Sequence, residues 1–457
     1  MSSFNSFGLS KAMVSNLEQL GFEQPTDIQA KALPVCLAGK DVIAMAQTGS
    51  GKTAAFGIGL IEHLNPRLFA VQGLVLCPTR ELADQVAKAI RELARAQHNI
   101  KVLTLCGGVP IGPQIGSLSH GAHIVVGTPG RIQDHLRKQT LSLDRVGTVV
   151  LDEADRMLDM GFQEAVEDIL SHCPSKRQTL LFSATWPSDI RRLSGRYQSD
   201  PVDVRVESGQ GNPDIRELFY EVERGQTDAA IMALLSEQQP SSCIVFCTTK
   251  QQCDELAYTL TEEGFSALAL HGDLDQRDRD SVLVRFGNQS CSVLVATDVA
   301  ARGLDIKSLP LVINAEPARD PEVHTHRVGR TGRAGEQGLA VTFCTPSQGH
   351  KINRLESERG ASVEWGDASV LMTVELSPSA PPMKTLCIAG GRKDKIRPGD
   401  VLGALTGEAG VPGSAVGKID LFDYQCFVAI ERNLARKALK RLENGRIKGR
   451  KVRVRFA

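Results

Sequence analysis

Aromatic residues and long apolar stretches are both scarce in this 457-residue chain. Aromatics make up 5% of it, with 2 Trp and 4 Tyr. No stretch reaches 18 consecutive apolar residues, so the sequence predicts no membrane-spanning helix. The first residues, MSSFNSFGLSK, have neither the basic nor the apolar region of a signal peptide. None of the 11 cysteines forms a CxxC pair, which argues against a zinc finger. The cysteines are most simply small buried side chains, and a reduced, cytoplasmic setting fits them.

Net charge is also absent, because 53 Lys and Arg balance 53 Asp and Glu. The balance hides an uneven distribution. Residues 383–457 carry 17 basic against 7 acidic side chains, a net charge of +10, and the rest carries 36 against 46, a net charge of −10. A basic module on an acidic body predicts phosphate binding by the C-terminal part, as in proteins that bind nucleic acids.

The apolar pattern predicts three folded domains. Short apolar runs alternate with longer helical stretches from residue 41 onward, and the alternation restarts after a Gly- and Pro-containing segment at 207–214. This rhythm is typical of parallel sheets with helices on both faces. A Pro- and Ser-rich spacer then precedes a strand-helix-strand-strand-helix-strand pattern, the ferredoxin-like order of RNA-recognition motifs. We therefore predict domains at 1–206, 215–370 and 383–457, joined by linkers at 207–214 and 371–382.

Two short motifs predict ATP hydrolysis. The string AQTGSGKT fits a P-loop except that Ala46 stands at the usual first Gly, and LDEAD follows about a hundred residues later. Lys52 is expected to reach the outer phosphates, Thr53 and Asp152 to hold Mg²⁺, and Glu153 to orient and deprotonate the attacking water. DEAD alone also occurs as an acidic helix start, but its order after a P-loop favours a nucleotide site. The predicted loop residues are Ala46, Gln47, Thr48, Gly49, Ser50, Gly51, Lys52 and Thr53.

With these motifs in place, the chain resembles the DEAD-box family of RNA helicases over residues 1 to about 365. The further motifs, in family order, are GFEQPTDIQ (21–29), PTREL (78–82), GG (107–108), TPGR (128–131), SAT (183–185), IVFCTT, QRDR, ATDVAARGLDI (296–306) and HRVGRTGR (326–333). The resemblance implies two tandem RecA-like domains, so the whole chain is expected to be α/β with a small C-terminal α+β domain.

The resemblance implies roles for further nucleotide-site residues. Gln29 would read the adenine edge, Phe22 would stack on the base with Phe4 behind it, and Thr26 belongs to the same motif. A core aromatic is the less favoured alternative for Phe22. Two arginines of the second domain resemble the family's arginine fingers, which stabilise charge in phosphoryl transfer, although a single arginine is more often a surface ion-pair partner. These residues of the second domain are Arg330 and Arg333, with Gly303 and Asp305 beside them.

The resemblance also implies an RNA track that contacts phosphates and 2′-hydroxyls, and so selects RNA without reading sequence. Ser183 and Thr185 would couple it to the nucleotide site, although SAT is also a plausible strand-end turn. The implied track residues are Thr79, Arg80, Gly108, Thr128, Gly130, Arg131, Gln276, Arg279, Thr297 and Arg302.

The C-terminal domain departs from an ordinary RNA-recognition motif. In the matching stretch DYQCFVAI (423–430), Phe427 is kept but Gln425 replaces the first stacking aromatic, and the first strand has no aromatic. Stacking is worth about 1–3 kcal/mol per base, so basic residues are the better candidates. This basic, degenerate motif resembles the DbpA subfamily of bacterial DEAD-box helicases, which implies 23S ribosomal RNA as the target. The predicted contacts are Arg392, Lys393, Lys395, Arg397, Phe427, Arg432, Arg436, Lys437, Lys440 and Arg441.

The sequence therefore predicts an RNA-stimulated ATPase that melts short RNA duplexes during assembly of the large ribosomal subunit. ATP and Mg²⁺ are the expected cofactors and RNA is the expected partner, with no membrane and no indicated protein partner. Two alternatives stay open: an ATP-gated RNA clamp with little unwinding, and a DNA helicase of the same superfamily.

Overall fold

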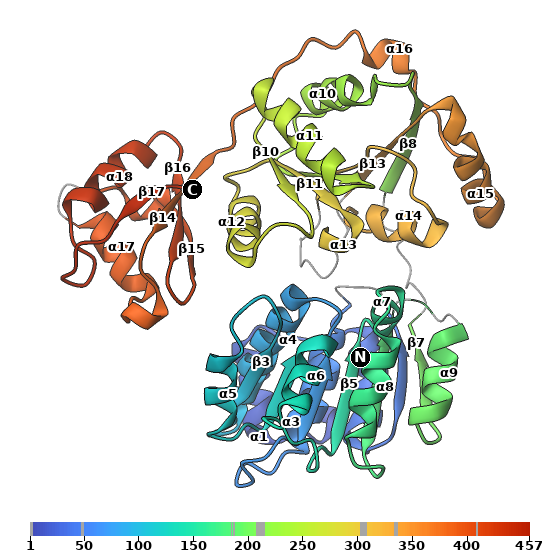
Figure 1. Cartoon of the computed structure of the whole chain (residues 1–457), viewed down its shortest axis with the longest axis vertical. Coiled ribbons are helices and arrows are strands. Elements are labelled where there is room, and N and C mark those ends of the chain that lie inside the picture. Colours follow the sequence, from blue (N-terminus) through green and yellow to red (C-terminus); the bar gives the residue numbers. More distant parts are fainter. Residues whose placement is uncertain are drawn as a thin grey trace. The chain divides into compact units, whose positions relative to one another are not determined.

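The computed structural model describes residues 3–46, 50–183, 185, 188–206, 215–301, 309–332, 337–407 and 410–457. It shows two compact units, the first built on one parallel sheet and the second on a parallel and an antiparallel sheet (Figure 1). No helix in the described ranges is both long and apolar enough to cross a membrane.

The first sheet has seven parallel strands in the order β3-β4-β2-β5-β6-β1-β7. They are β1 (Val42–Met45), β2 (Gly73–Leu76), β3 (Val102–Leu105), β4 (Ile124–Gly127), β5 (Thr148–Asp152), β6 (Gln178–Ser183) and β7 (Val202–Arg205). The helices are α1 (Lys11–Gln19), α2 (Asp27–Leu37), α3 (Lys52–Glu62), α4 (Arg80–Leu93), α5 (Gly112–Leu118), α6 (Pro129–Arg137), α7 (Ala154–Asp159), α8 (Gln163–Ser171) and α9 (Ser188–Tyr197).

Helices cover both faces of this sheet. Ala32 of α2, Ile58 of α3 and Val86 of α4 belong to one buried cluster. On the opposite face, residues such as Ile132 of α6 and Ile169 of α8 form a second cluster. Strands covered on both faces are expected to be uniformly apolar, which explains runs such as GLVL and TVVLD.

Strand register aligns the motif-bearing ends. Met45 pairs with Ser183, and Asp152 pairs with Phe182, so the carboxyl ends of β1, β6 and β5 lie in one row. Leu76, Gly127 and Leu105 extend that row through β2, β4 and β3. Loops at the carboxyl ends of parallel strands are the usual ligand sites of such sheets.

The second parallel sheet has six strands in the order β10-β11-β9-β12-β13-β8. They are β8 (Ile215–Glu221), β9 (Cys243–Cys247), β10 (Ala267–Leu270), β11 (Val293–Thr297), β12 (Leu311–Asn314) and β13 (Gly338–Cys344). The helices are α10 (Thr227–Gln238), α11 (Lys250–Glu262), α12 (Gln276–Gly287), α13 (Asp298–Ala301), α14 (Pro321–Val328), α15 (Gly349–Arg359) and α16 (Ala368–Leu371).

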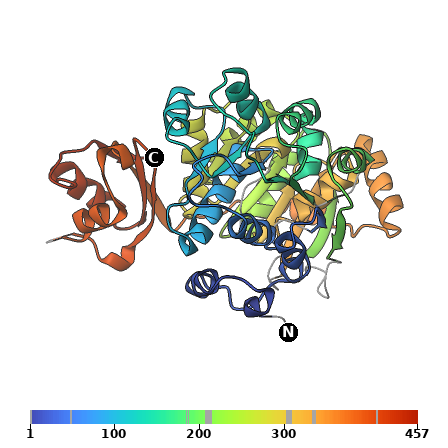
Figure 2. The ribbon, with the colours of Figure 1, turned by 90° about the horizontal axis from the view of Figure 1, so that it is seen from below.

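The C-terminal sheet is antiparallel, in the order β15-β16-β14-β17. Its elements are β14 (Met383–Ile388), α17 (Pro398–Thr406), β15 (Val416–Leu421), β16 (Cys426–Glu431), α18 (Ala435–Asn444) and β17 (Val454–Phe456), which confirms the predicted order. Side chains of α17 and α18 pack with alternate strand residues in one core, so the helices cover a single face, as the orange and red domain of Figure 2 shows.

Candidate nucleotide site and RNA interface

The phosphate-binding loop leads directly into α3. Gly51 caps this helix in the left-handed region at φ 95°, a conformation that glycine adopts without strain. Lys52 is buried, and its Nζ donates to the carbonyl of Ala46 at 3.0 Å. The first turn of α3 starts at this residue, and the backbone N–H groups of a first helical turn favour binding of an anion. Gln47, Thr48 and Gly49 lie outside the described residues.

Gln29 ties the preceding motif to this loop. Its Oε1 accepts from the backbone N–H of Thr26 at 3.0 Å, and its Nε2 donates to the Gly51 carbonyl at 3.1 Å. The Thr26 hydroxyl donates to the Ser50 carbonyl at 2.8 Å. A Cβ at Gly51 would lie 2.5 Å from Gln29 Nε2, so this contact itself requires glycine. A primary amide keeps one N–H and one lone pair beyond these bonds, which is what reading an adenine edge needs.

Phe22 precedes this amide in the same motif and packs edge-on against the buried Phe4, with ring centroids 6.1 Å apart. Phe22 is half-buried. Phe4 lies in the N-terminal turn Phe4–Phe7, and its contact orients the Phe22 ring. The sequence predicted Phe4 in this supporting position.

The acidic motif begins at the end of β5. Asp152 is 3% exposed, and burial is the main cause that raises its pKa to about 6, opposed by the nearby Lys52 ammonium. Its Oδ1 accepts from the backbone N–H of Glu153 at 3.1 Å. Glu153 has φ 51°, an uncommon value for a residue with a side chain. Such positions cluster at functional sites, and this one turns the chain from the strand into α7.

A direct contact joins the acidic motif to the SAT motif. Asp155 Oδ2 accepts from both the backbone N–H and the hydroxyl of Thr185, each at 2.9 Å. The Ser183 hydroxyl donates to the Thr185 carbonyl at 2.7 Å. Thr185 is therefore bonded directly to α7, the helix that follows Glu153. Sequence reasoning did not single out Asp155, although it is the last letter of DEAD.

The predicted RNA track starts at two helix N-termini of the first unit. Thr79 caps α4 by accepting from the Leu82 N–H at 3.3 Å, and Thr128 precedes α6. Gly108 has φ 75°, and a Cβ there would lie 1.6 Å from an Arg80 guanidinium nitrogen. The guanidinium of Arg80 therefore lies directly over the backbone of Gly108, which brings these two predicted residues together.

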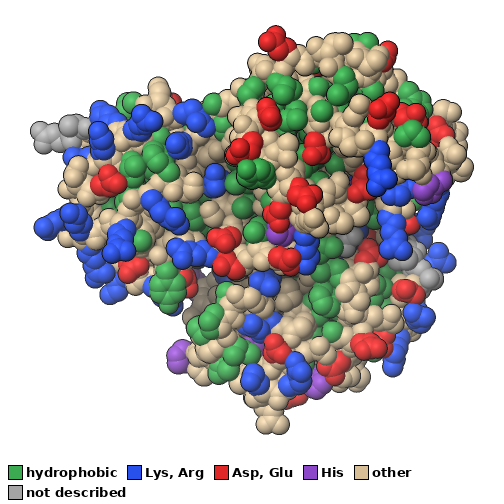
Figure 3. Space-filling view, turned by 45° about the horizontal axis from the view of Figure 1, so that its top comes forward, with side chains coloured by type: hydrophobic (Ala, Val, Ile, Leu, Met, Phe, Trp, Pro, Cys, Tyr) green, Lys and Arg blue, Asp and Glu red, His purple; other side chains and the backbone are tan. Residues whose placement is uncertain are grey.

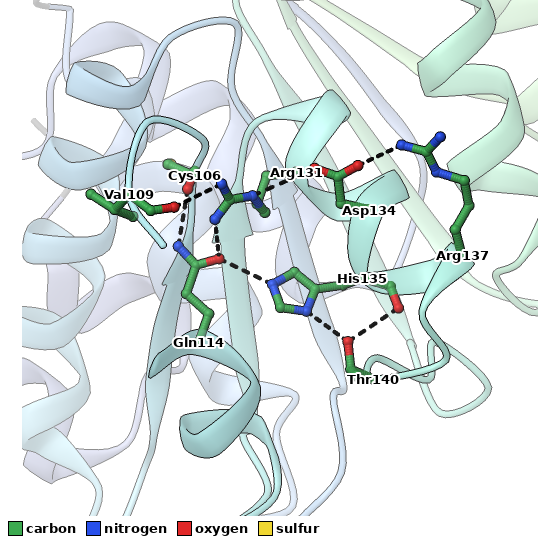
Figure 4. Close-up of polar contacts among 8 residues, drawn as sticks. All are labelled: Cys106, Val109, Gln114, Arg131, Asp134, His135, Arg137 and Thr140. Carbon is green, nitrogen blue, oxygen red and sulfur yellow. Dashed lines mark hydrogen bonds and ion pairs between the residues drawn. The ribbon is translucent and has the colours of Figure 1, made fainter. Parts of the chain in front are cut away.

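Arg131 is held by a polar network around α5 and α6 (Figure 4). Its two terminal nitrogens donate to Gln114 Oε1 and to the Val109 carbonyl, both at 2.9 Å. Its Nε has no hydrogen-bond partner among the described residues, and Asp134 lies 3.6 Å away. Arg131 thus shapes the loop that follows Gly108 as well as being a predicted RNA contact.

His135 completes that network. Its Nε2 lies 3.0 Å from Gln114 Oε1, which can only accept, so Nε2 carries a proton. Its Nδ1 lies 2.8 Å from the Thr140 hydroxyl. Burial and the charge of Arg131 lower the pKa of His135, so the ring stays neutral near Arg131.

In the second unit, Gln276 and Arg279 lie in the first turn of α12. Gln276 Nε2 donates to Asp280 Oδ1 at 2.8 Å, and an Arg279 nitrogen donates to the Ala300 carbonyl at 2.9 Å. Thr297 ends β11 and is buried. Arg330 is also buried, just after α14. Arg302, Gly303, Asp305 and Arg333 lie outside the described residues.

An unpredicted ion pair fixes the HRVGRTGR segment. Arg327 binds both carboxylate oxygens of Asp298, at 2.6 and 2.8 Å, and its guanidinium lies over the Phe246 ring. Arg327 is 3% exposed. The first arginine of the motif therefore has a structural role. The bidentate contact between Arg327 and Asp298 forms because the fold brings these two residues together.

Most basic side chains of the C-terminal domain are exposed, and Lys and Arg crowd its surface at the left of Figure 3. Arg432 lies in the turn before α18, so only Arg436 and Lys440 share the predicted helix face. Arg432 donates to the Pro381 carbonyl, and Arg441 is half-buried and donates to the Ala404 carbonyl. The exposed predicted contacts are Arg392, Lys393, Lys395, Arg397, Arg432, Arg436, Lys437 and Lys440.

Phe427 was predicted as an RNA contact, but its side chain is 2% exposed and packs against Val284 of α12. RNA cannot reach this ring in the structure.

Comparisons with known proteins decide the family. The chain matches the models of the DEAD/DEAH box helicase over residues 26–193 and the helicase conserved C-terminal domain over 226–335. It is 54% identical over 451 residues to the ATP-dependent RNA helicase DbpA of Escherichia coli (strain K12), covering 98% of each chain. The chain belongs to the DEAD-box family of ATP-dependent RNA helicases. Members of this family are RNA-dependent ATPases, so the protein is an enzyme of that class.

Two further similarities extend over the helicase part. A DEAD-box ATP-dependent RNA helicase CshA of Geobacillus kaustophilus is 48% identical over 78% of this chain and 76% of its own. The structure of S. cerevisiae Dbp5 bound to RNA and ADP BeF3 aligns with a TM-score of 0.74 at 28% identity, over 82% of this chain and 99% of that one. Residues 385–456 match the model of the DbpA RNA binding domain. The two RecA-like domains and the small C-terminal domain expected from the sequence are thus confirmed.

Proposed function

We propose that this helicase hydrolyses Mg²⁺-ATP on the first parallel sheet and is directed to 23S ribosomal RNA by its C-terminal domain, in the cytoplasm, during assembly of the large subunit. The alignment of β1, β6 and β5 carries the proposal, because it brings Lys52 and Asp152 to the same edge of the sheet, with the Asp155–Thr185 contact beside them. The proposed domain limits are 1–206, 215–370 and 383–457.

The residues that would hold Mg²⁺ fit a hard cation. Thr53 offers a hydroxyl, and Asp152 offers a carboxylate whose raised pKa reflects a buried charge with too little compensation. When bound, the ion would neutralise charge on the phosphates. Glu153 would orient the attacking water, while Arg330 and Arg333 of the second domain would stabilise the charge that develops.

RNA would follow the row of strand ends at β2, β4 and β3. There Arg80 covers Gly108, Thr128 and Gly130 open α6, and Arg131 is fixed by Gln114. Ser183 and Thr185 would couple this track to the acidic motif. A comparison of duplex release in ATP and in a non-hydrolysable analogue distinguishes a helicase from a clamp. A clamp should release no more strand with ATP than it does by binding and trapping RNA with the analogue.

The ribosomal target rests on the exposed basic side chains around α18. DbpA of Escherichia coli, by its name an RNA helicase, shares this domain along with 54% identity. Binding of 23S RNA fragments should weaken steeply with salt, because each phosphate contact contributes about 0.7–0.9 to the slope of log affinity against log salt. A variant that loses one contact should show a slope that is smaller by this amount.

Lys440→Glu on α18 tests this, with Lys418→Glu as the matched control on β15, where Lys418 is exposed and paired with Asp420. We expect the first variant to lower both the affinity for a 23S fragment and the salt slope, and the second to leave both unchanged. Equal affinity of the wild-type protein for 23S fragments and unrelated RNA would contradict the proposed target.

A further inference from the structure

The glycine loop, residues 107–111, has little apolar packing of its own. It leads from β3 to α5, and the side chains of Val109 and Pro110 are exposed. Helix α5, which the structure describes in full, buries no side chain. Gly107 and Gly108 open the loop, and glycine loses more conformational freedom on folding than any other residue. Other contacts are therefore needed to hold the loop in one conformation.

Side chains from two helices bind carbonyl groups at the start and in the middle of the glycine loop (Figure 4). Gln114 Nε2, in the first turn of α5, donates to the Cys106 carbonyl at 2.9 Å. A terminal nitrogen of Arg131, on α6, donates to the Val109 carbonyl at 2.9 Å. These two polar bonds act on the loop where apolar contacts are few.

The Gln114 amide links the two bonds to each other. Its Oε1 accepts from the second terminal nitrogen of Arg131 at 2.9 Å and from His135 Nε2 at 3.0 Å. The oxygen therefore faces two donors, and the nitrogen faces the Cys106 carbonyl. A flipped amide would direct its N–H groups at donors and its oxygen at a carbonyl, so only one orientation is satisfied.

His135 supports this orientation from a buried position on α6. The ring is fully buried, and its Nδ1 lies 2.8 Å from the Thr140 hydroxyl. A hydroxyl that donates to Nδ1 leaves the proton of the neutral ring on Nε2, which is the tautomer that Gln114 Oε1 requires. The imidazole is therefore a fixed donor behind the amide.

We propose that Gln114 and His135 are positioning residues of the RNA track. His135 orients the Gln114 amide, and this amide holds the glycine loop and Arg131 in the conformation that binds RNA before RNA is present. Neither residue has to touch RNA for this effect. The effect on RNA rests on the proposed track through Gly108 and Arg131, whereas the effect on the loop does not.

The place of Gly108 explains why a fixed loop favours RNA. Gly108 lies between the two bound carbonyls of Cys106 and Val109, and the Arg80 guanidinium covers it. A loop that is already ordered loses little conformational freedom when RNA binds, so the bonds raise the RNA affinity without a direct contact.

Two substitutions of His135 separate positioning from packing. A Gln side chain places an N–H near the position of the ring Nε2, whereas an Asn side chain places one near Nδ1. We expect His135→Gln to behave as the wild-type protein does, and His135→Asn to release the loop. Gln114→Leu should release it as well. Because Gln114 is only partly buried, this variant keeps the test available if substitutions of His135 prevent folding.

Gln133→Leu is the matched control. Gln133 lies on the same helix as His135, but its amide donates to Asp168 Oδ2 of α8 at 2.7 Å and not to the glycine loop. This variant should leave both the loop and the response to RNA unchanged.

Hydrogen exchange of the full chain without nucleotide or RNA measures the loop directly. The backbone N–H groups of Gln114 and Ile115 both donate to the carbonyl of Ile111, the last loop residue. Exchange of these amides should be about tenfold faster in Gln114→Leu and His135→Asn, because the polar bonds that oppose local opening are lost. His135→Gln and Gln133→Leu should keep the wild-type rate.

The ATPase measures the effect on RNA. In Gln114→Leu and His135→Asn, the RNA concentration for half-maximal ATPase should rise about tenfold, which corresponds to about 1.4 kcal/mol of lost RNA affinity. The maximal rate at saturating RNA and the ATP affinity should stay unchanged, whereas a general loss of fold would lower both. His135→Gln and Gln133→Leu should respond to RNA as the wild-type protein does.

Three results would overturn the proposal. Wild-type exchange in Gln114→Leu and His135→Asn would show that the network does not hold the loop. Equal losses in His135→Gln and His135→Asn would assign the effect to packing of the ring. Faster exchange without any change in the response to RNA would reject the positioning role, and Gly108→Ala then separates two causes. If Gly108→Ala weakens the response to RNA, the proposed track stands; if it does not, the track itself is wrong.

Discussion

Replacement of Asp152 by Asn should stabilise the nucleotide-free protein while it abolishes ATP hydrolysis. The carboxyl of Asp152 is 3% exposed, and burial raises its pKa from 3.8 to about 6. The native state therefore binds the proton more tightly than the unfolded chain does. At pH 7 the ionised carboxylate lowers the free energy of unfolding by about 3 kcal/mol, since each unit of pKa corresponds to about 1.4 kcal/mol.

The sign of the pH dependence follows from the same linkage. Between the unfolded and the folded pKa the native state holds more protons, so the stability of the wild-type protein falls as pH rises through this window. The amide that replaces the carboxyl in the variant cannot titrate. The gain in stability of Asp152→Asn should therefore be about 3 kcal/mol at pH 7 and about half of that at pH 5.

Urea unfolding of the full chain without nucleotide or Mg²⁺ measures this, with hydrogen exchange of the β5 amides reporting on the first unit. Asp144→Asn is the control, because Asp144 is exposed in a loop of the same unit and should show no such gain. A gain that is absent at pH 7, or that is equal at pH 5 and pH 7, would refute the assignment of a buried and poorly compensated charge.

Three further outcomes follow from the described contacts. Gly108→Ala should displace Arg80, because the new Cβ would lie 1.6 Å from its guanidinium, and should raise the RNA concentration for half-maximal ATPase about tenfold without changing ATP affinity. A filter-binding assay showing weaker ATP binding would contradict a role confined to RNA. Arg327→Lys should lower the free energy of unfolding by about 2–3 kcal/mol, since Lys cannot bind both oxygens of Asp298, and calorimetry of the full chain checks it. At Mg²⁺ concentrations below saturation, ATPase activity should fall about tenfold per pH unit below pH 6 as Asp152 takes up its proton, and a flat profile down to pH 5 would contradict this.

Sequence patterns located the central strands because those strands are covered on both faces and read as continuous apolar runs. The edge strands β7 and β8 do not form such apolar runs, since VDVR and IRELFYE mix charged and apolar residues. One side of an edge strand has no neighbour, so its composition resembles that of a surface loop.

The candidate site shows the same division. Lys52 and Asp152 were predicted from motifs whose chemistry requires particular residue types at fixed spacing, whereas Thr185 was implied only by the resemblance to the family. The partners of other motif residues were not. Asp298 binds Arg327 across 29 residues of sequence, and Gln114 holds Arg131 across 17. Nothing in local sequence marks such pairs, because they depend on where separate strands end.

By itself, the sequence determined the family and the order of domains and predicted the chemistry of the nucleotide site, since these depend on short motifs and on apolar periodicity. It also showed that the C-terminal domain lacks the usual stacking residues. Only the tertiary structure decided that Phe427, the aromatic which that domain keeps, is buried. Phe427 reads as an RNA contact in the sequence, yet it is buried under Val284 because α12, some 140 residues earlier, packs on the same face. Contacts between distant segments follow from the packing of whole domains, which no local pattern records.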